Sequence, residues 1–550
     1  MDDPTGMRPV AVIRAGLRRV AREEGQALVL VVFLILVLGL LSPLLLATMT
    51  SSASQSQSAL VQARAHAAAE AGINTYIAKL LNDSQYYLHY LAPGEATRLT
   101  GGTNVSSVTT PGTPTPWPST YGRSWTYPSK DAWLDLGNGY SYDVEVTPPQ
   151  TGTNTTNFLL ITATGKSNLN GSLVHDRQVL QTLMRPASVA DFQMFSKGSV
   201  CYGDGANTNG KIYTQGNLYY SGTAYADLNA EQSIFLPPTS ARSGDPCSTS
   251  GQSNTGKVIS PATQYNSTNI RSAPELSTMP NFSAFQVSLV DINRAAQNAK
   301  GIYLTNGTNT STSPPSAWQL TFNSNGTVTY KSCRKTSNPV QSTQPTCDGS
   351  VANQGAVLGT SCSTSPYCAG SGTVAIPSNG AIYSDQTLII AGGTSSCTSG
   401  GTAGGPTGSN VSLSNASCVK GRVTAASGQD IVVADDVGYV TPGTDVLGLM
   451  ANTNFYISSW IPVGSDLNWS AASLAENGSW GQPSGVSNGR FGTMYHEGSI
   501  AQLQMGNGMQ MFDTRYYNYD PNLLYLQPPW FPTLPNPYQV RLYRNLPNSS

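Results

Sequence analysis

The chain has 550 residues, of which only 11% are charged, and its formal net charge is −1. That charged share is about half of the usual one, and a chain without a basic excess is not expected to bind nucleic acid. Glycine, serine, threonine, asparagine and tyrosine take the place of the charged residues. This composition is typical of extracellular β-rich proteins, and the length allows two or three domains.

An uncharged stretch begins after Glu24 and ends before Arg64. Within it, residues 26–47 are the predicted membrane span, and their apolar run, interrupted by Ser42 and Pro43, is about 21 residues long, enough to cross roughly 30 Å of hydrocarbon as a helix. A cleavable secretory segment has a shorter apolar core of about 7–15 residues, so we expect a retained anchor. Arginines that flank a span stay in the cytoplasm, which predicts a single pass with the N-terminus inside; the five that precede this span are Arg8, Arg14, Arg18, Arg19 and Arg22.

The helix is expected to continue beyond the membrane, over residues 26–85 in all. Alanine-rich composition favours helix, and Pro43 is expected to kink the helix without ending it. From about Ala27 to Leu81 such a helix would be roughly 80 Å long. Its second half is amphipathic and needs a domain to lie against; we expect the buried stripe to be Leu60, Ala63, Ala67, Ala71, Ile77 and Leu81.

The start of this helix has a recognisable pattern. A charged leader ends in Gly25, the apolar helix begins at once with Gln26, and "AAAEAG" follows on the same helix. The pattern resembles the prepilin-like proteins of type IV pili, above all the PilX-type minor pilins and pseudopilin K of type II secretion. The residues of the helix motif are Ala69, Glu70, Ala71 and Gly72.

The resemblance implies a leader of residues 1–25, which prepilin peptidase would cut between Gly25 and Gln26. It also implies the inner membrane and other pilins as partners, the latter contacted through the helix. The fifth mature position is Leu30, where most pilins carry a glutamate. This departure argues against a repeating major subunit and fits the minor class. A plain, uncleaved membrane anchor is the alternative.

Residues 86–186 are predicted to form a small pilin-like β head. Residues 86–130 are rich in Tyr, Thr, Pro and Gly and indicate a loop. Three segments with strand-like alternation follow at 140–148, 157–165 and 172–184. We expect a three- or four-stranded antiparallel sheet that covers the amphipathic half of the helix.

Residues 187–550 repeat a different rhythm, in which two short β segments flank a polar break. Examples are "GKIYTQGNLYYSG", "GAIYSDQTLIIAG" and "GRVTAASGQDIVVADDV". Stacked solenoid coils give this pattern. The predicted fold class is therefore α+β, with a distal right-handed β-helix preferred and a β-sandwich as the alternative. The aromatic and proline-rich C-terminus, residues 513–538, is expected to cap the open end of the solenoid.

The eight cysteines all lie in the distal half, which indicates disulfides in an oxidising compartment. Zinc is the alternative, but there is no CxxC pair and no histidine lies near a cysteine cluster. The simplest pairing joins neighbours and leaves other connectivities open: Cys201 with Cys247, Cys333 with Cys347, Cys362 with Cys368, and Cys397 with Cys418.

No motif points to catalysis, and we expect neither a metal nor a cofactor. "VADDV" could present a carboxylate pair like that of a glycosidase, but a solvated turn explains it better; the candidate carboxylates are Asp430, Asp435, Asp436 and Asp445. Asp204 is a single carboxylate in a Gly/Asn-rich loop, too few for calcium. His496-Glu497 lacks the second histidine of an HExxH motif.

The sequence therefore predicts a non-enzymatic minor pilin-like protein of a type IV pilus or a related pseudopilus. Its expected role is initiation of assembly, or display and adhesion at the tip, with a host or surface ligand as a further candidate partner. We expect it in the bacterial cytoplasmic membrane and at the cell surface. The alternative is a membrane-anchored surface β-helix protein that binds or cleaves polysaccharide.

Overall fold

The structure is a computed structural model of the whole chain. The described residues are 24–82, 98–99, 125–127, 133–137, 139–147, 159–167, 177–203, 206–220, 223–236, 252–255, 257–259, 270–272, 288–297, 300–305, 315–334, 340–361, 370–399, 411–487, 489–504, 506 and 509–546. Residues 1–23, which make up most of the expected leader, lie outside this set.

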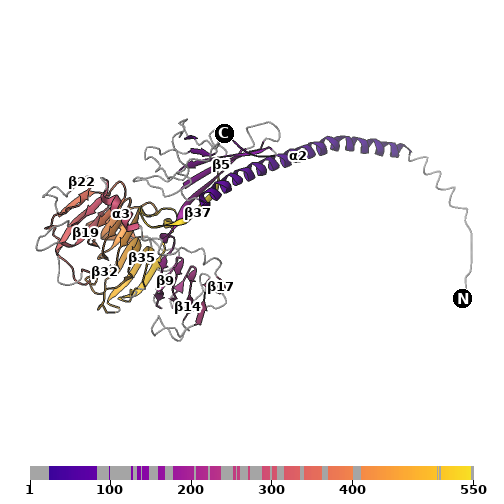
Figure 1. Cartoon of the computed structure of the whole chain (residues 1–550). Coiled ribbons are helices and arrows are strands. Elements are labelled where there is room, and N and C mark those ends of the chain that lie inside the picture. The colour runs from indigo at the N-terminus through magenta and orange to yellow at the C-terminus, as the bar shows by residue number, and fades with distance from the viewer. Residues whose placement is uncertain are drawn as a thin grey trace, which may run out of the picture.

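One helix dominates the N-terminal part of the chain. Helix α2 (Glu24–Asn82) is continuous over 59 residues and contains Pro43 in its interior. Figure 1 shows it as a single, gently curved rod that projects from the rest of the molecule. Past the proline, the hydroxyl groups of Thr48 and Thr50 donate to the carbonyls of Leu45 and Leu46, both at 2.9 Å. The prediction of one long helix is confirmed.

The second half of α2 lies on an antiparallel sheet, which we call the head. Its strand order is β1-β2-β4-β5-β6-β37, with β3 also paired to β4. Three of these strands match the three segments predicted from their alternation. The strands are β1 (Arg98–Leu99), β2 (Trp125–Tyr127), β3 (Leu134–Gly137), β4 (Tyr140–Thr147), β5 (Leu159–Ser167), β6 (Arg177–Ser188) and β37 (Thr533–Leu546).

Small residues let α2 approach the sheet closely. A Cβ at Gly165 would lie 1.9 Å from the carbonyl oxygen of Ala65, and one at Gly72 would lie 2.8 Å from the Tyr142 ring. The predicted stripe is therefore wrong in detail, since Leu60 and Leu81 are about half exposed. The sheet selects the face with the smallest side chains because backbone contact requires it; the buried helix residues are Val61, Ala65, Ala68, Ala69, Gly72, Ile73, Tyr76 and Leu80.

The last strand of the chain belongs to the head. Strand β37 pairs antiparallel with β6, from Leu546 beside Val179 to Thr533 beside Ser188. The expectation that residues 513–538 cap the distal domain is therefore wrong for residues 533–538, and residues 539–546, predicted to lie in that domain, belong to the head as well. The open edge of β6 needs a partner for its backbone groups, and "YQVRLYRNL" supplies a strand there. The distal part of the chain is thus an insertion between two neighbouring strands of the head sheet (Figure 1).

Residues 189–532, which we call the distal body, form several further sheets within the described residues. The α+β class is thereby confirmed at the level of one long helix followed by a large β-rich region. Nine short strands run parallel in one continuous row. In spatial order they are β18 (Ile302–Leu304), β24 (Ala381–Ser384), β28 (Arg422–Ser427), β31 (Val446–Ala451), β33 (Leu467–Ala475), β35 (Phe491–Gln502), β7 (Met194–Ser196), β10 (Ile212–Thr214) and β13 (Leu228–Ala230).

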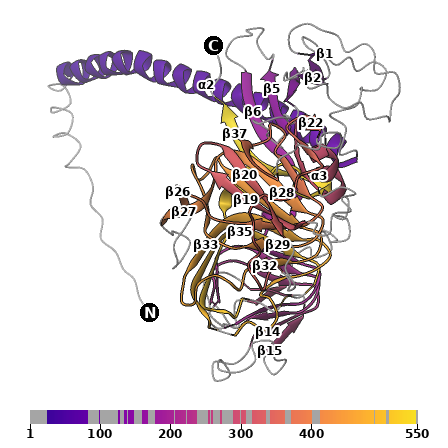
Figure 2. The same cartoon turned by 90° about the vertical axis from the view of Figure 1, so that its left-hand side faces the viewer.

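The spatial order shows that the chain enters and leaves the row at the same place. Ile500 of β35 lies beside Met194 of β7, although the two are at opposite ends of the insertion. From this point β10 and β13 extend the row in one direction, and β33 to β18 extend it in the other. Figure 2 shows the two groups stacked as one body below the head. The two ends of the body therefore meet near the head sheet.

The row buries both of its faces. Alternate residues such as Leu449 point into an inner core, which includes the stacked rings of Phe455 and Trp469, 5.2 Å apart. The opposite face, with Met450, is covered by helix α3 (Ser288–Gln297) and by the segment that precedes β37. In that segment Leu523 and Phe531 are buried against the row. The part of the aromatic, proline-rich segment that precedes β37 thus covers a face of the body. We had expected this segment to cap the end of the body.

We predict that Gly165→Ala weakens the contact between α2 and the head. The added methyl group overlaps the backbone of Ala65 and Ala69, and overpacking of this kind costs about 1–3 kcal/mol. Chemical unfolding of the full chain in detergent, followed by tryptophan fluorescence, measures the loss. Gly39→Ala is the matched control, because a Cβ there meets no atom within 4 Å. Equal stability of the two variants would contradict the packing described.

Candidate functional site

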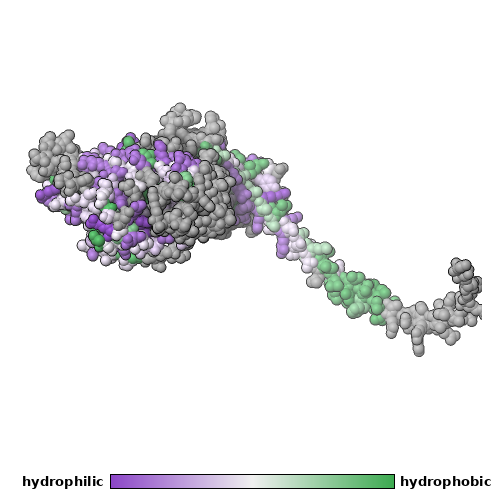
Figure 3. All heavy atoms as spheres, turned by 90° about the horizontal axis from the view of Figure 1, so that it is seen from below, coloured by the Kyte–Doolittle hydropathy of each residue, from purple (hydrophilic) through white to green (hydrophobic). Residues whose placement is uncertain are grey.

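Two features of the described residues are candidates for function: the first half of α2 and the junction between head and body. The helix half is apolar on all sides, and its large side chains are exposed in the described part of the chain. Leu28, Phe33 and Leu46 expose 68%, 66% and 65% of their surface. Within the described residues, this is the one helix that is long and apolar enough to cross a membrane. Figure 3 shows its apolar residues gathered along the part that projects from the molecule.

The residues of the prepilin-like pattern occupy distinct places on this helix. Gly25 and Gln26 lie in the first turn of α2. Leu30 is in the projecting half and is 65% exposed. In the helix motif, Ala69 and Gly72 are buried against the sheet, Ala71 is half-buried and Glu70 is exposed.

Glu70 reaches the last strand of the chain. Its Oε1 lies 3.4 Å from His66 Nε2 and accepts a hydrogen bond of 3.4 Å from the hydroxyl of Tyr543. Burial, followed by the Glu70 carboxylate, raises the pKa of Tyr543 to about 12. The motif therefore has a structural use here, because its small residues fit the sheet and its glutamate contacts β37.

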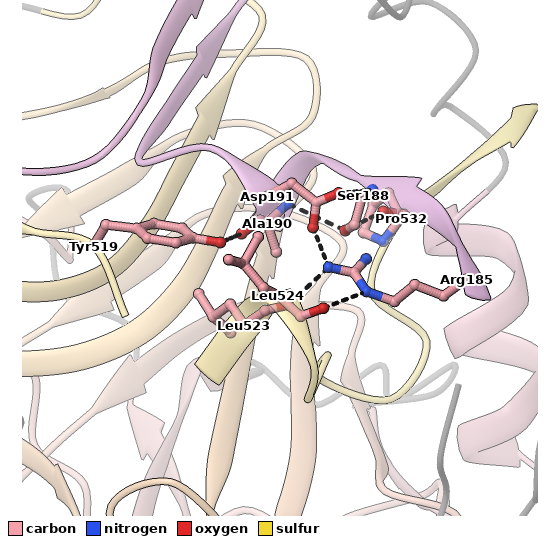
Figure 4. A network of polar contacts seen from close by, with 8 residues as sticks. All are labelled: Arg185, Ser188, Ala190, Asp191, Tyr519, Leu523, Leu524 and Pro532. Carbon is pink, nitrogen blue, oxygen red and sulfur yellow. Dashed lines mark hydrogen bonds and ion pairs between the residues drawn. The ribbon is translucent and has the colours of Figure 1, made fainter. Parts of the chain in front are cut away.

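The junction is organised around a fully buried arginine (Figure 4). Arg185, on β6, donates from Nε to the carbonyl of Leu524 and from Nη2 to that of Leu523, both at 2.9 Å. Nη2 also pairs with the carboxylate of Asp191. Leu523 and Leu524 belong to the 3-10 turn η7 (Pro521–Leu524), and Asp191 to η2 (Val189–Asp191). One side chain of the head thus holds both the start and the end of the body.

A second set of hydrogen bonds reinforces the same place. Ser188 caps η2: its hydroxyl accepts from the Ala190 N–H at 3.1 Å, and its own N–H donates to Asp191 at 3.0 Å. The Ser188 hydroxyl also donates to the Pro532 carbonyl at 2.8 Å, while Tyr519 donates to the Ala190 carbonyl at 3.0 Å. Because a buried charge is tolerated only when it is paired and hydrogen-bonded, these contacts allow Arg185 to lie in the interior.

This junction was not predicted from the sequence, although one part of the junction has a recognisable sequence pattern. Ser188-Val-Ala-Asp191 has the spacing of a capping box, which would have placed a turn at the boundary between head and body. Arg185 and the carbonyls it binds are more than 300 residues apart in sequence. No local pattern connects them, so these contacts could not have been predicted.

The carboxylates considered for catalysis bind backbone N–H groups. Asp430 accepts from Asn454 at 2.8 Å, Asp435 from Asp436 at 2.8 Å, and Asp436 from Asn468 at 2.8 Å. Asp445 accepts from Gly421 at 2.7 Å and Thr441 at 2.6 Å. Burial raises the pKa of Asp435 and of Asp436, the latter also through Asp435. In these positions each carboxylate fastens a turn.

The remaining candidates from the sequence are His496, a metal site and Asp204. His496 is fully buried beside Trp469, with ring centroids 4.1 Å apart, and burial lowers its pKa to about 3. Among the described residues, no group of three or more His, Cys, Asp or Glu side chains could hold a metal ion. Asp204 lies outside the described residues.

Two disulfides join neighbouring cysteines, as in the simplest pairing from the sequence. They are Cys333–Cys347 and Cys397–Cys418. The second connects strands β26 (Ser395–Ser399) and β27 (Val411–Val419), which closes the loop between them. Cys201 is also disulfide-bonded. Three further cysteines lie outside the described residues: Cys247, Cys362 and Cys368.

We predict that Arg185→Met destabilises the junction strongly. The change leaves the Asp191 charge buried without its partner, and breaking such a pair costs about 3–5 kcal/mol. Chemical unfolding of the full chain measures the loss. The double variant Arg185→Met with Asp191→Asn should recover part of it, because no lone charge remains.

The control for this prediction is the ion pair of Arg334 with Asp348, in which the arginine side chain is 58% exposed. Exposed pairs contribute little to stability, so Arg334→Met should have a much smaller effect. If Arg334→Met and Arg185→Met cost the same, the junction does not hold head and body together as described.

Known proteins show only a distant similarity to this chain. No family model matches it, and no curated protein matches it. Among solved structures, the chain is similar to the competence-associated pilin ComZ from Thermus thermophilus, at 11% identity over 88% of this chain and 98% of that chain, with a TM-score of 0.27. A score this low carries no argument about fold or function, so the function of this chain has to be inferred from its own residues.

Proposed function

We propose that this chain is a minor pilin-like component of a type IV pilus or a related pseudopilus. One observation carries the proposal. A single helix of 59 residues projects an apolar, exposed half and docks its other half on an antiparallel sheet. A helix that is apolar all round needs an apolar environment. A membrane supplies this before assembly, and the helices of neighbouring pilins supply it afterwards.

The proposal gives each part of the helix a role. Prepilin peptidase cuts between Gly25 and Gln26, and residues 26–47 remain in the membrane with their N-terminus on the cytoplasmic side. Leu30 lacks the carboxylate that would pair with the N-terminal amine of a neighbouring subunit. The chain therefore serves as a minor subunit that initiates assembly or sits at the tip.

The distal body is the part displayed at the surface, where it would contact a host or another surface. We propose that it is a right-handed β-helix. The support is the row of parallel strands, in which Ala425 lies beside Leu449 and Leu449 beside Ser473. Parallel strands joined by crossovers are right-handed in nearly all proteins. A β-sandwich would require mainly antiparallel neighbours in this row.

We propose that the chain has a non-enzymatic role and does not bind or cleave polysaccharide. The geometry that favours this choice is that of the "VADDV" carboxylates. Asp435 and Asp436 each accept a backbone N–H at 2.8 Å, so both carboxylates are used to hold turns of the body. An assay of the full chain on polysaccharides tests the alternative. Turnover that is abolished by Asp435→Asn and Asp436→Asn would support the alternative.

The mature N-terminus tests the pilin proposal. We predict that mass spectrometry of the chain from its native membrane finds N-methylated Gln26 as the first residue. Gly25→Val should block the cut, because the resemblance places the peptidase site after this glycine. The same substitution at Gly39, inside the apolar helix, is the control and should leave processing intact. An intact Met1, or a start near Ser54, would overturn the proposal.

A further inference from the structure

A pocket of about 390 Å³ lies between α3 and the parallel row. Helix α3 packs on β18, β24 and β28 of that row (Figure 2). The helix supplies one wall of the pocket and the turns that follow β28, β31 and β33 supply the other. The lining residues are Leu289, Val290, Asn293, Tyr383, Gly428, Asn452, Glu476 and Asn477.

The pocket contains a buried acid with an unsatisfied oxygen. Glu476 follows directly on β33 and is only 3% exposed. Its backbone N–H donates to the Ala451 carbonyl at 2.9 Å, which fixes the residue in the turn. The side-chain Oε2 is buried, yet no group in the described part of the chain donates to it. Burial alone raises the pKa of this carboxyl to about 8.

The other walls offer acceptors and apolar surface, but the lining residues include no cation. Asn452 uses its amide N–H to bind the Gly428 carbonyl at 3.1 Å, and Asn477 donates to Asn452 Oδ1 at 2.9 Å. The amide oxygen of Asn477 is a further acceptor on this wall. Leu289 and Val290 add apolar contacts. At Gly428 a Cβ would lie 2.8 Å from the Tyr383 hydroxyl, so the absence of a side chain there keeps the pocket open.

The titratable groups around the pocket do not neutralise the acid. Tyr383, on β24, is an uncharged phenol, and Asp385, the first residue after β24, is a second acid; burial is the main cause that raises the pKa of each. Asp385 accepts a hydrogen bond from Thr305. On α3, Arg294 pairs with Asp291 on the same helix at 3.3 Å, and both side chains are exposed. The surroundings of Glu476 are therefore acidic or neutral.

We propose that this pocket binds a primary alkylammonium group, with Glu476 as its counter-ion. The ammonium would donate to Glu476 Oε2, which has no donor in the described part of the chain, and would supply the positive charge that balances the carboxylate. The alkyl chain would lie along Leu289 and Val290. A free polyamine and the side chain of a lysine on a partner both present this chemistry. The inference is independent of the pilin proposal.

Calorimetry of the full chain in detergent tests the inference with n-butylammonium chloride as the probe. Because the ligand binds the ionised carboxyl, affinity should rise close to tenfold for each pH unit up to about pH 8 and then level off. At pH 7, titrations in two buffers of different ionisation enthalpy should report nearly one proton released per site. Absence of binding, or binding without proton release, would overturn the inference.

Variants test whether binding depends on the Glu476 carboxyl or only on the rest of the pocket. Glu476→Gln keeps the shape of the side chain but not the charge, and should weaken n-butylammonium binding at least tenfold. Glu145→Gln, on β4 of the head, is the matched control and should bind as the parent chain does. Uncharged n-butanol should bind parent and Glu476→Gln equally weakly. Unchanged ammonium binding by Glu476→Gln would overturn the inference even if the parent chain binds.

Two further probes distinguish the sources of the ammonium group. Spermidine represents a free polyamine, and Nα-acetyl-lysine amide represents a lysine side chain of a partner. Tighter binding of the first assigns the pocket to a small molecule, and tighter binding of the second assigns it to a protein contact; either result supports the ammonium site. Binding of glucose that matches that of the amines would contradict it, because a sugar does not need the charge.

Discussion

The arrangement of this molecule depends on one buried ion pair, Arg185 with Asp191. The distal body is inserted between two neighbouring strands of the head sheet, so both of its ends must leave that sheet close to each other. Arg185 satisfies this requirement chemically. Its guanidinium binds the carboxylate of η2, at the start of the body, and two carbonyls of η7, near the end of the body. An arginine that is paired with a carboxylate and hydrogen-bonded to carbonyls tolerates burial that a lone charge would not.

The insertion also explains how the body is held against the helix. A domain joined by a single flexible linker samples many orientations, whereas here two chain segments cross the boundary and the Ser188 cap reinforces them. The same last strand that completes the head, β37, also contacts α2 through Tyr543 and Glu70. Helix, head and body are thus connected through one sheet, and a displacement of α2 relative to the head would strain the contacts of β37.

Much of the secondary structure could be predicted from local pattern. The long helix and strands β4, β5 and β6 follow from apolar length and alternation, and the parallel strands of the body from their repeated rhythm. The errors have physical reasons. The buried face of α2 is set by how closely Gly165 lets the helix backbone approach, which a hydrophobic stripe does not encode. Strand β37 was missed because its partner β6 is more than 300 residues away, and the junction was missed for the same reason.

Arg185 and Glu476 are two of the deeply buried ionisable residues, and their surroundings differ in the partners that they offer. Arg185 is bound by an acid and two carbonyls, while no group in the described part of the chain donates to Glu476 Oε2. An unpaired buried carboxyl opposes folding increasingly as the pH rises from its ordinary pKa of 4.5 toward 8, because the folded state holds the proton more tightly than the unfolded chain does. Packing of the Glu476 side chain does not offset this free-energy cost, since the side chain faces a pocket. A ligand that carries the missing charge would remove it, and the position of Glu476 in the pocket is best explained by that ligand.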